Sequence, residues 1–271
     1  MDTDLGRFPA QAEIPEPLKF AWPIVVLPEL FTTSRHLATL VGYFATIGWE
    51  VYAPDLHAAI GHGGTPSLEK IDFAKLTELA AEAVAALRRD AIVVGHGIGG
   101  LVALKLAERA GVKAAVAIAP LAPGFRTALI MPRWNLLSNW QHRPLNPPTR
   151  RVLFEFVADA DAHSRPQIIK TLTHGATAAA LEVVKGDLSF AAEKTAPRLI
   201  VAGESDIFAP YEKLDQFAKR IEAPIVKIPG RGHWLIGGRG LERAINEIQR
   251  FLVRSLGRDL LLLYPEEWKN E

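Results

Sequence analysis

Residues that can move protons stand in four short segments of this chain. Glu29 follows an apolar run, and His96 lies in a glycine-rich turn. Asp206 and His233 each stand in a glycine-containing segment that follows another apolar run. Histidine and carboxylate side chains are common general acids and bases of enzymes. The chain contains no cysteine, which excludes thiolate catalysis, disulfides and cysteine-ligated metal.

The elements around these residues alternate between strand and helix. Short apolar runs, typical of buried parallel strands, occur at Pro23–Leu27, Trp49–Ala53, Ala91–Val94, Lys113–Ala119, Arg198–Gly203 and Ile225–Pro229. Helical spacing of apolar residues predicts helices over 34–47, 73–88, 98–110, 211–221 and 241–254. This alternation predicts a doubly wound, mostly parallel α/β sheet with helices on both faces.

The alternation breaks once. Residues 124–195 contain aromatic and basic clusters and helical stretches but no clear strand. We therefore expect a core of residues 1–123 plus 196–271, interrupted by a helical cap over 124–195. Residues 1–22, rich in proline and charge, are interpreted as an extended lead-in. The apolar segment Asp259–Tyr264 either packs on the core or docks on a partner subunit, so a homodimer is possible.

The composition is ordinary for a soluble globular enzyme. Hydrophobic residues make up 49% of the 271 positions, charged residues make up 23%, and the net charge is +1. This balance gives no reason to expect a nucleic-acid or membrane partner. We identify no secretory signal and no apolar run of about 18 residues. The expected location is therefore cytoplasmic.

The segment Gly95-His96-Gly97-Ile98-Gly99-Gly100, between a predicted strand and a predicted helix, resembles the nucleophile elbow of the α/β-hydrolase superfamily. The elbow of that family reads G-x-S-x-G, and Gly97 stands where the family has its nucleophile. The segments around Asp206 and His233 follow in the family's order and resemble its acid and histidine loops. The resemblance covers roughly residues 23–255. It implies the α/β-hydrolase fold, with His233 as general base and Asp206 as the carboxylate that orients it.

Gly97 removes the nucleophile that the resemblance would require. An elbow nucleophile sits in a strained backbone conformation, and glycine there relieves on the order of 1–3 kcal/mol. The replacement is explained either by loss of function, natural or engineered, or by a mechanism without a covalent serine step. The space vacated at position 97 is expected to hold a water molecule between His233 and a substrate.

Glu29 is a second departure from the family. In the family the first central strand is followed by His-Gly and an oxyanion-hole amide, whereas here it is followed by Leu27-Pro28-Glu29-Leu30. The amides of Leu30 and Ile98 can still form an oxyanion hole, because backbone donors do not depend on the side chain. Glu29 is either a solvated or ion-paired loop residue, or an acid or second base beside that hole.

Three hypotheses follow from these residues. The first is a cofactor-independent, metal-free enzyme in which His233 and Asp206 act on a small, apolar, activated substrate such as a lactone, an ester or an epoxide. Its reaction is hydrolysis or a lyase or isomerase step. The second is a non-catalytic protein that binds a ligand in the old pocket. The third is a serine esterase whose nucleophile was replaced, in which Gly97→Ser would restore burst kinetics.

Aromatic residues are the expected walls of the substrate pocket. Trp134, Trp140 and Phe154 lie in the predicted cap, while Trp234 follows His233. His96 is more often a packed neighbour of the elbow than a catalyst, and it is included as a pocket residue.

Overall fold

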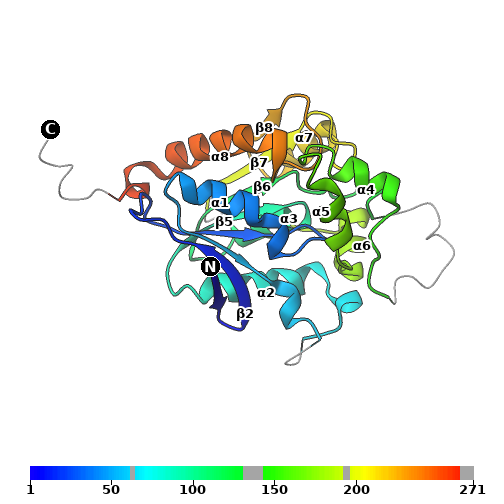
Figure 1. The fold of residues 1–271 in the computed structure, drawn as a ribbon, viewed down its shortest axis with the longest axis horizontal. Coiled ribbons are helices and arrows are strands. Elements are labelled where there is room, and N and C mark those ends of the chain that lie inside the picture. Colours follow the sequence, from blue (N-terminus) through cyan, green and yellow to red (C-terminus); the bar gives the residue numbers. More distant parts are fainter. Residues whose placement is uncertain (62–64, 131–142, 192–195, 263–271) are drawn as a thin grey trace, which may run out of the picture.

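A twisted sheet of eight strands forms the centre of the computed structural model, which describes residues 1–61, 65–130, 143–191 and 196–262 (Figure 1). Its order is β1-β2-β4-β3-β5-β6-β7-β8. The strands are β1 (Asp2–Leu5), β2 (Phe8–Glu13), β3 (Ile24–Leu27), β4 (Val51–Pro54), β5 (Ala91–His96), β6 (Val112–Ile118), β7 (Arg198–Gly203) and β8 (Ile225–Ile228). The strands from β4 to β8 in this order are parallel. The expected α/β-hydrolase sheet is confirmed.

The central strands form because their side chains are apolar on both faces. Every residue of β3, β5 and β7 is buried, as a parallel strand covered by helices on both sides requires. The register pairs Leu27 of β3 with Gly95 of β5. The loops that carry Glu29 and Gly97 therefore leave the sheet side by side.

The N-terminal residues do not form an extended lead-in, and that expectation was wrong. They form an antiparallel hairpin, β1–β2, which adds to the edge of the sheet next to β4. In β2 the buried residues Phe8, Ala10 and Ala12 alternate with more exposed ones, the pattern of an antiparallel strand with one covered face.

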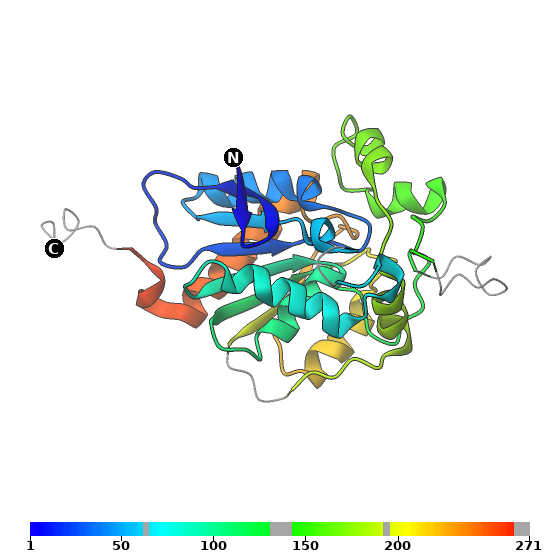
Figure 2. The same ribbon diagram turned by 90° about the horizontal axis from the view of Figure 1, so that it is seen from below.

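Helices cover both faces of the sheet (Figure 2). They are α1 (Ala38–Thr46), α2 (Phe73–Ala85), α3 (Ile98–Leu106), α7 (Tyr211–Arg220) and α8 (Leu241–Leu256). Helices α1 and α8 lie on one face, and α2, α3 and α7 lie on the other. No helix within the described residues is both long enough and apolar enough to cross a membrane.

The segment between β6 and β7 carries α4 (Arg150–Phe156), α5 (Arg165–Thr171) and α6 (Thr177–Lys185). These helices gather at one end of the sheet (Figure 1). In the described part of this segment the only β pairing is an isolated bridge between Leu145 and Gly175. All three helices lie within the range 124–195, and the division into a core and a helical cap stays a prediction.

The described part of the C-terminal apolar segment packs on the core. Leu260 is fully buried, and Leu261 forms an isolated bridge with Phe20. Leu261 and Leu262 are exposed, and the rest of the segment lies outside the described residues.

Candidate active site

The turn between β5 and α3 has the tight geometry that the sequence predicts. Gly97 adopts φ +53° and ψ −119°, where a side chain is strained. A Cβ at Gly95 would lie 2.1 Å from the carbonyl oxygen of Gly99, and a Cβ at Gly99 would lie 2.4 Å from that of Pro28. Strand, helix and the β3 loop thus approach too closely for any residue but glycine at these positions.

The carboxylate of Glu29 fills the space beside Gly97. Its Oε2 atom lies 0.9 Å from the point that a Cβ on Gly97 would occupy, and the Glu29 side chain is fully buried. A carboxylate from the β3 loop therefore stands where the elbow's own side chain would begin. No side chain at position 97 fits while Glu29 keeps this position.

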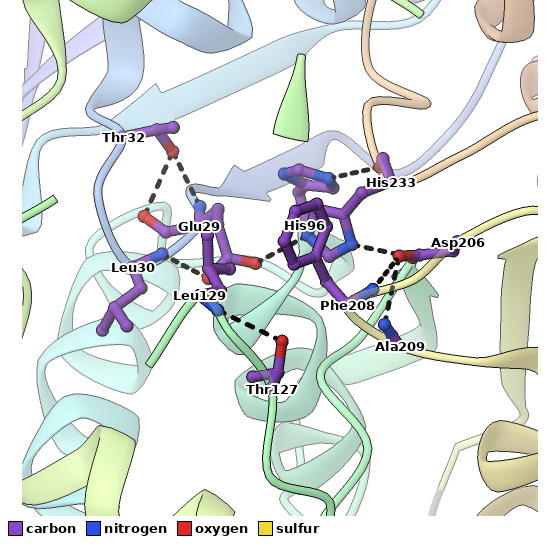
Figure 3. Close-up of polar contacts among 10 residues, drawn as sticks. All are labelled: Glu29, Leu30, Thr32, His96, Thr127, Leu129, Asp206, Phe208, Ala209 and His233. Carbon is purple, nitrogen blue, oxygen red and sulfur yellow. Dashed lines mark hydrogen bonds and ion pairs between the residues drawn. The ribbon is translucent and has the colours of Figure 1, made fainter. Parts of the chain in front are cut away.

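Local hydrogen bonds hold Glu29 in place (Figure 3). The amide of Leu30 donates to Oε1 at 2.6 Å. The hydroxyl of Thr32 accepts from the Glu29 amide at 2.9 Å and lies 3.1 Å from the Glu29 carbonyl oxygen, to which it donates. The Leu30 amide, one of the two expected oxyanion donors, is thus bound to Glu29 itself. The other, Ile98, begins helix α3, where the first amides have no acceptor within the helix.

His233 lies between two carboxylates (Figure 3). Its Nδ1 is 2.8 Å from Oδ2 of Asp206, and its Nε2 is 3.4 Å from Oε2 of Glu29. Asp206 also accepts hydrogen bonds from the amides of Phe208 and Ala209, at 2.8 and 3.1 Å. None of the three acid–base side chains is exposed. The structure therefore brings together His233, Asp206 and Glu29, the three residues expected to act as acids, bases or orienting groups.

Two negative neighbours decide the charge of His233. Burial alone lowers its pKa, but Asp206 and then Glu29 favour the protonated ring and raise the pKa to about 10. The imidazole thus carries a proton at neutral pH. The role of His233 as general base stays a prediction, and the two carboxylates favour the protonated ring in this resting arrangement.

His96 packs behind this group. Its Nε2 lies 3.0 Å from the carbonyl oxygen of His233, so this nitrogen carries the hydrogen and Nδ1 has a lone pair. Nδ1 is buried and has no hydrogen-bond partner among the described residues. Burial, and then the charge of His233, lower the pKa of His96 to about 4. The neutral ring supports the backbone of His233, as expected for a packed neighbour of the elbow.

The same residues are the candidates for a metal site. Glu29, His96 and His233 each offer one possible ligand atom, all within 4.8 Å of one another. A metal would have to displace the proton that His233 holds between its carboxylates. The ion pairs already account for the arrangement of His233 and Glu29, so metal-free chemistry stays our prediction.

Asp159, which sequence reasoning missed, holds the histidine loop. Its carboxylate accepts from the Gly232 amide at 2.5 Å and lies 3.5 Å from guanidinium nitrogens of both Arg231 and Arg239. Asp159 belongs to the segment between β6 and β7, so that segment is fastened to the residue before His233. No motif marks it, because the contact exists only in the folded chain.

A small apolar cavity of about 30 Å³ adjoins Glu29. Residues of helices α2 and α3, of the β3 loop and of the segment between β6 and β7 contribute to its walls, which include both expected oxyanion residues, Leu30 and Ile98. The lining residues are Leu27, Pro28, Glu29, Leu30, Leu56, His57, Ile60, Leu68, Leu76, Ile98, Gly99, Val102 and Ala176. Most of these apolar residues stand at ordinary core positions of helices and loops, so no sequence signal singled them out.

The predicted aromatic walls do not line this cavity in the described structure. Phe154 is 39% exposed and lies under the guanidinium of Arg150, because it occupies the outer face of α4. Trp234 is buried against His96 and Phe156. Trp134 and Trp140 lie outside the described residues.

The fold is shared with enzymes of diverse activity. Over 92% of this chain and 100% of the other, the structure resembles a monoacylglycerol lipase of Paleococcus ferrophilus, with 18% identity and a TM-score of 0.67. An esterase of Thermogutta terrifontis matches over 92% of this chain and 94% of its own, with 16% identity and a TM-score of 0.65. A variant of tomato methylketone synthase I, solved with β-ketoheptanoate, matches over 86% and 98%, with 17% identity and a TM-score of 0.63.

These low identities establish the fold alone. No protein with a curated description matches the chain by sequence. The sequence profile of the alpha/beta hydrolase family, however, matches residues 21–243, which is most of the chain. This protein is therefore a member of the alpha/beta hydrolase family.

Proposed function

We propose that this protein is a cofactor-independent enzyme that acts without a serine nucleophile on a small, apolar, activated substrate. Lactones, esters and epoxides are the substrate classes that fit. The observation that carries the proposal is the position of Glu29, whose carboxylate fills the space beside Gly97 and faces His233. The Glu29 carboxylate and the His233 imidazole, both able to transfer protons, thus lie at the position that the nucleophile occupies in a serine triad.

The pair supplies acid and base at one point. Protonated His233 can donate to a leaving or developing oxyanion, while Glu29 can accept a proton from water or from a substrate carbon acid. One such group typically contributes about 10²–10⁴ in rate. That is modest for an ordinary amide but sufficient for a strained or activated substrate, so the reaction is hydrolysis or a lyase or isomerase step.

The walls of the cavity support an apolar substrate. Leu56, Leu68, Leu76 and Val102 are among its lining residues, so an alkyl group would contact apolar side chains beside Glu29. A substrate carboxylate would meet the negative charge of Glu29 in a buried setting, which is unfavourable. The expected cytoplasmic location and the possible homodimer remain predictions.

Uncharged variants of Glu29 and His233 test the proposed acid–base function. We expect Glu29→Gln and His233→Gln each to lower turnover of p-nitrophenyl butyrate, γ-octalactone or 1,2-epoxyhexane by at least about 100-fold. Glu247→Gln is the matched control, because Glu247 pairs with Arg250 on α8, outside the candidate site. Turnover that neither site variant changes would overturn the proposal.

One observation favours a non-catalytic alternative. The hydrogen bonds among the Leu30 amide, Glu29, His233 and Asp206 are already formed without a substrate, as they would be in a cluster that only stabilises the fold. A thermal-shift screen of metabolites followed by mass spectrometry of the bound species separates the two functions. Recovery of unchanged ligand indicates binding alone, and recovery of product indicates an enzyme.

The third hypothesis, a serine esterase whose nucleophile was replaced, has less support. A Cβ at position 97 would collide with the Glu29 carboxylate, so Gly97→Ser has room for its hydroxyl only if Glu29 first leaves His233. Burst kinetics with an activated ester in the single variant Gly97→Ser would restore this alternative.

A further inference from the structure

Two histidines and a carboxylate meet beside the turn between β5 and α3, and the lone pair of one histidine is unused. The Nε2 of His96 donates to the carbonyl oxygen of His233, so Nδ1 of His96 carries a lone pair. That nitrogen is buried and has no hydrogen-bond partner among the described residues. The ion pair between His233 and Glu29 does not involve it. A buried polar atom without a partner is costly, which points to a ligand that accepts this lone pair.

We propose that Glu29, His96 and His233 form a binding site for a divalent transition-metal ion such as Zn²⁺ or Co²⁺, and that the bound ion inhibits the enzyme. Only the inhibition rests on the proposed function, because a metal bound here would occupy both groups of the acid–base pair. The binding itself is independent of any activity, and the chemistry of turnover stays metal-free.

The spacing of the possible ligand atoms suits such an ion. Oε2 of Glu29 lies 3.4 Å from Nε2 of His233. Two ligand atoms bound at about 2.1 Å with a tetrahedral angle between them lie about 3.4 Å apart, so this pair needs no movement. The three residues each offer one ligand atom within 4.8 Å of the others, so His96 has to approach by at most about 1.4 Å.

Each of the three side chains is also held by a second hydrogen bond, as metal ligands in proteins usually are (Figure 3). Asp206 binds Nδ1 of His233 at 2.8 Å, and the carbonyl oxygen of His233 binds Nε2 of His96 at 3.0 Å. The Leu30 amide donates to Oε1 of Glu29 at 2.6 Å. Each side chain thus has one atom bound to a neighbour and one atom left for a metal.

The donor atoms select the class of metal. Two imidazole nitrogens and one carboxylate oxygen suit zinc, cobalt, nickel and iron, whereas Mg²⁺ and Ca²⁺ prefer oxygen ligands alone. Binding exchanges one cation for another, because the metal takes Nε2 of His233 and the proton on that nitrogen leaves to solvent. The proposed acid is then lost and the carboxylate of Glu29 is engaged, so turnover should stop.

Cobalt tests the site without reference to activity. Protein freed of metal with a chelator is titrated with Co²⁺ and equilibrated at each step, because none of the three ligand side chains is exposed. We expect a single equivalent of Co²⁺ to give intense visible d–d bands, which arise when a protein holds the ion with few ligands rather than with six waters. Wild-type protein without such bands would overturn the site.

X-ray absorption by the zinc-loaded wild-type protein identifies the ligands and requires no variant. We expect two imidazole nitrogens at about 2.0–2.1 Å together with oxygen ligands. A zinc ion with fewer than two imidazoles would mean that it binds elsewhere, and the proposal would be wrong.

A histidine variant and a matched control assign the site to His96. Glutamine at this position can keep a donor for the carbonyl oxygen of His233 but has no ring nitrogen. We expect His96→Gln to weaken Co²⁺ binding by at least about 100-fold, the upper end of what loss of a supporting contact costs. His163→Gln makes the same substitution at an exposed histidine and should leave the bands unchanged. Bands of full intensity in His96→Gln would contradict the assignment.

Turnover separates the inhibition from the site. Zn²⁺ at a concentration that fills the site should lower turnover of p-nitrophenyl butyrate, γ-octalactone or 1,2-epoxyhexane by at least about 100-fold, and EDTA should restore it. Full turnover by the zinc-filled protein overturns the inhibition, while the spectra still establish the site. No turnover of any of these substrates by the metal-free protein overturns the proposed function, and the spectra again stand on their own.

Discussion

A methyl group at position 97 should disturb this protein far more than a change from glycine to alanine normally does. The Cβ of Gly97→Ala would lie 0.9 Å from Oε2 of Glu29, so the carboxylate must leave its place. Separating a buried carboxylate from its charged partner costs about 3–5 kcal/mol. Holding alanine at φ +53° costs about 1–3 kcal/mol more.

We therefore expect Gly97→Ala to lower the free energy of unfolding by about 4–8 kcal/mol, which is a large part of the usual total of about 5–15 kcal/mol. Urea denaturation followed by circular dichroism measures this change. Gly42→Ala in α1 is the matched control, because no atom lies within 4 Å of its added Cβ. That variant should be stabilised by about 0.5–1 kcal/mol.

A double-mutant cycle isolates the cause. In a Glu29→Ala background the added methyl has no carboxylate to displace, and only the backbone strain of about 1–3 kcal/mol remains. The cycle should thus give a coupling of about 3–5 kcal/mol between positions 29 and 97. A cost of Gly97→Ala that is the same with and without Glu29 would refute the placement of the carboxylate at the elbow.

Three further predictions follow from the site. Folding raises the pKa of His233 from 6.5 to about 10, so protonation of its ring stabilises the folded state by up to about 5 kcal/mol. This stabilisation is complete below pH 6.5 and is lost as the pH rises through 10. The urea concentration at the unfolding midpoint should fall between pH 6 and pH 10, and it should fall less in Glu29→Gln. The same pH dependence in both proteins would contradict the contribution of Glu29 to the pKa of His233. Asp159→Ala should cost about 1–3 kcal/mol and lower kcat by loosening the loop before His233, whereas Asp159→Asn keeps an acceptor for Gly232 and should lose less in the same urea and kinetic assays. Val102→Phe should fill the apolar cavity and raise KM for 1,2-epoxyhexane more than it changes kcat, and an unchanged KM would place the substrate elsewhere.

The sequence predicts the parts of the fold that are determined locally. Strands such as β3 are continuous apolar runs, so their burial on both faces can be inferred from the amino-acid pattern alone. The hairpin β1–β2 escaped prediction because its strands are short, and β2 contains Pro9 and alternates in polarity at the sheet edge.

The candidate site is only partly predictable, because its side-chain contacts join residues that are distant in sequence. Motif order indicates which loops meet, and the structure places Asp206 and His233 2.8 Å apart. Side-chain direction depends on neighbours that are distant in sequence. Glu29 turns towards His233 because Gly97 leaves room, and Asp159 reaches Gly232 only because the cap segment folds back onto that loop. The charge of His233 follows from both carboxylates together, and no single motif contains that information.

The register of the sheet explains why these two departures from the family belong together. Leu27 and Gly95 are neighbours on the adjacent parallel strands β3 and β5, and Glu29 and Gly97 each lie two residues further along. A long side chain on one strand can therefore reach the point where a short side chain on the other would begin. Glu29 cannot hold this position beside any side chain at 97, so glycine must be present before the carboxylate can enter. Once it has entered, His233 faces a negative charge, which adds to the larger effect of Asp206 in raising the pKa of the ring. Because Glu29 occupies the space beside position 97, reversal of Gly97 alone should not restore serine chemistry.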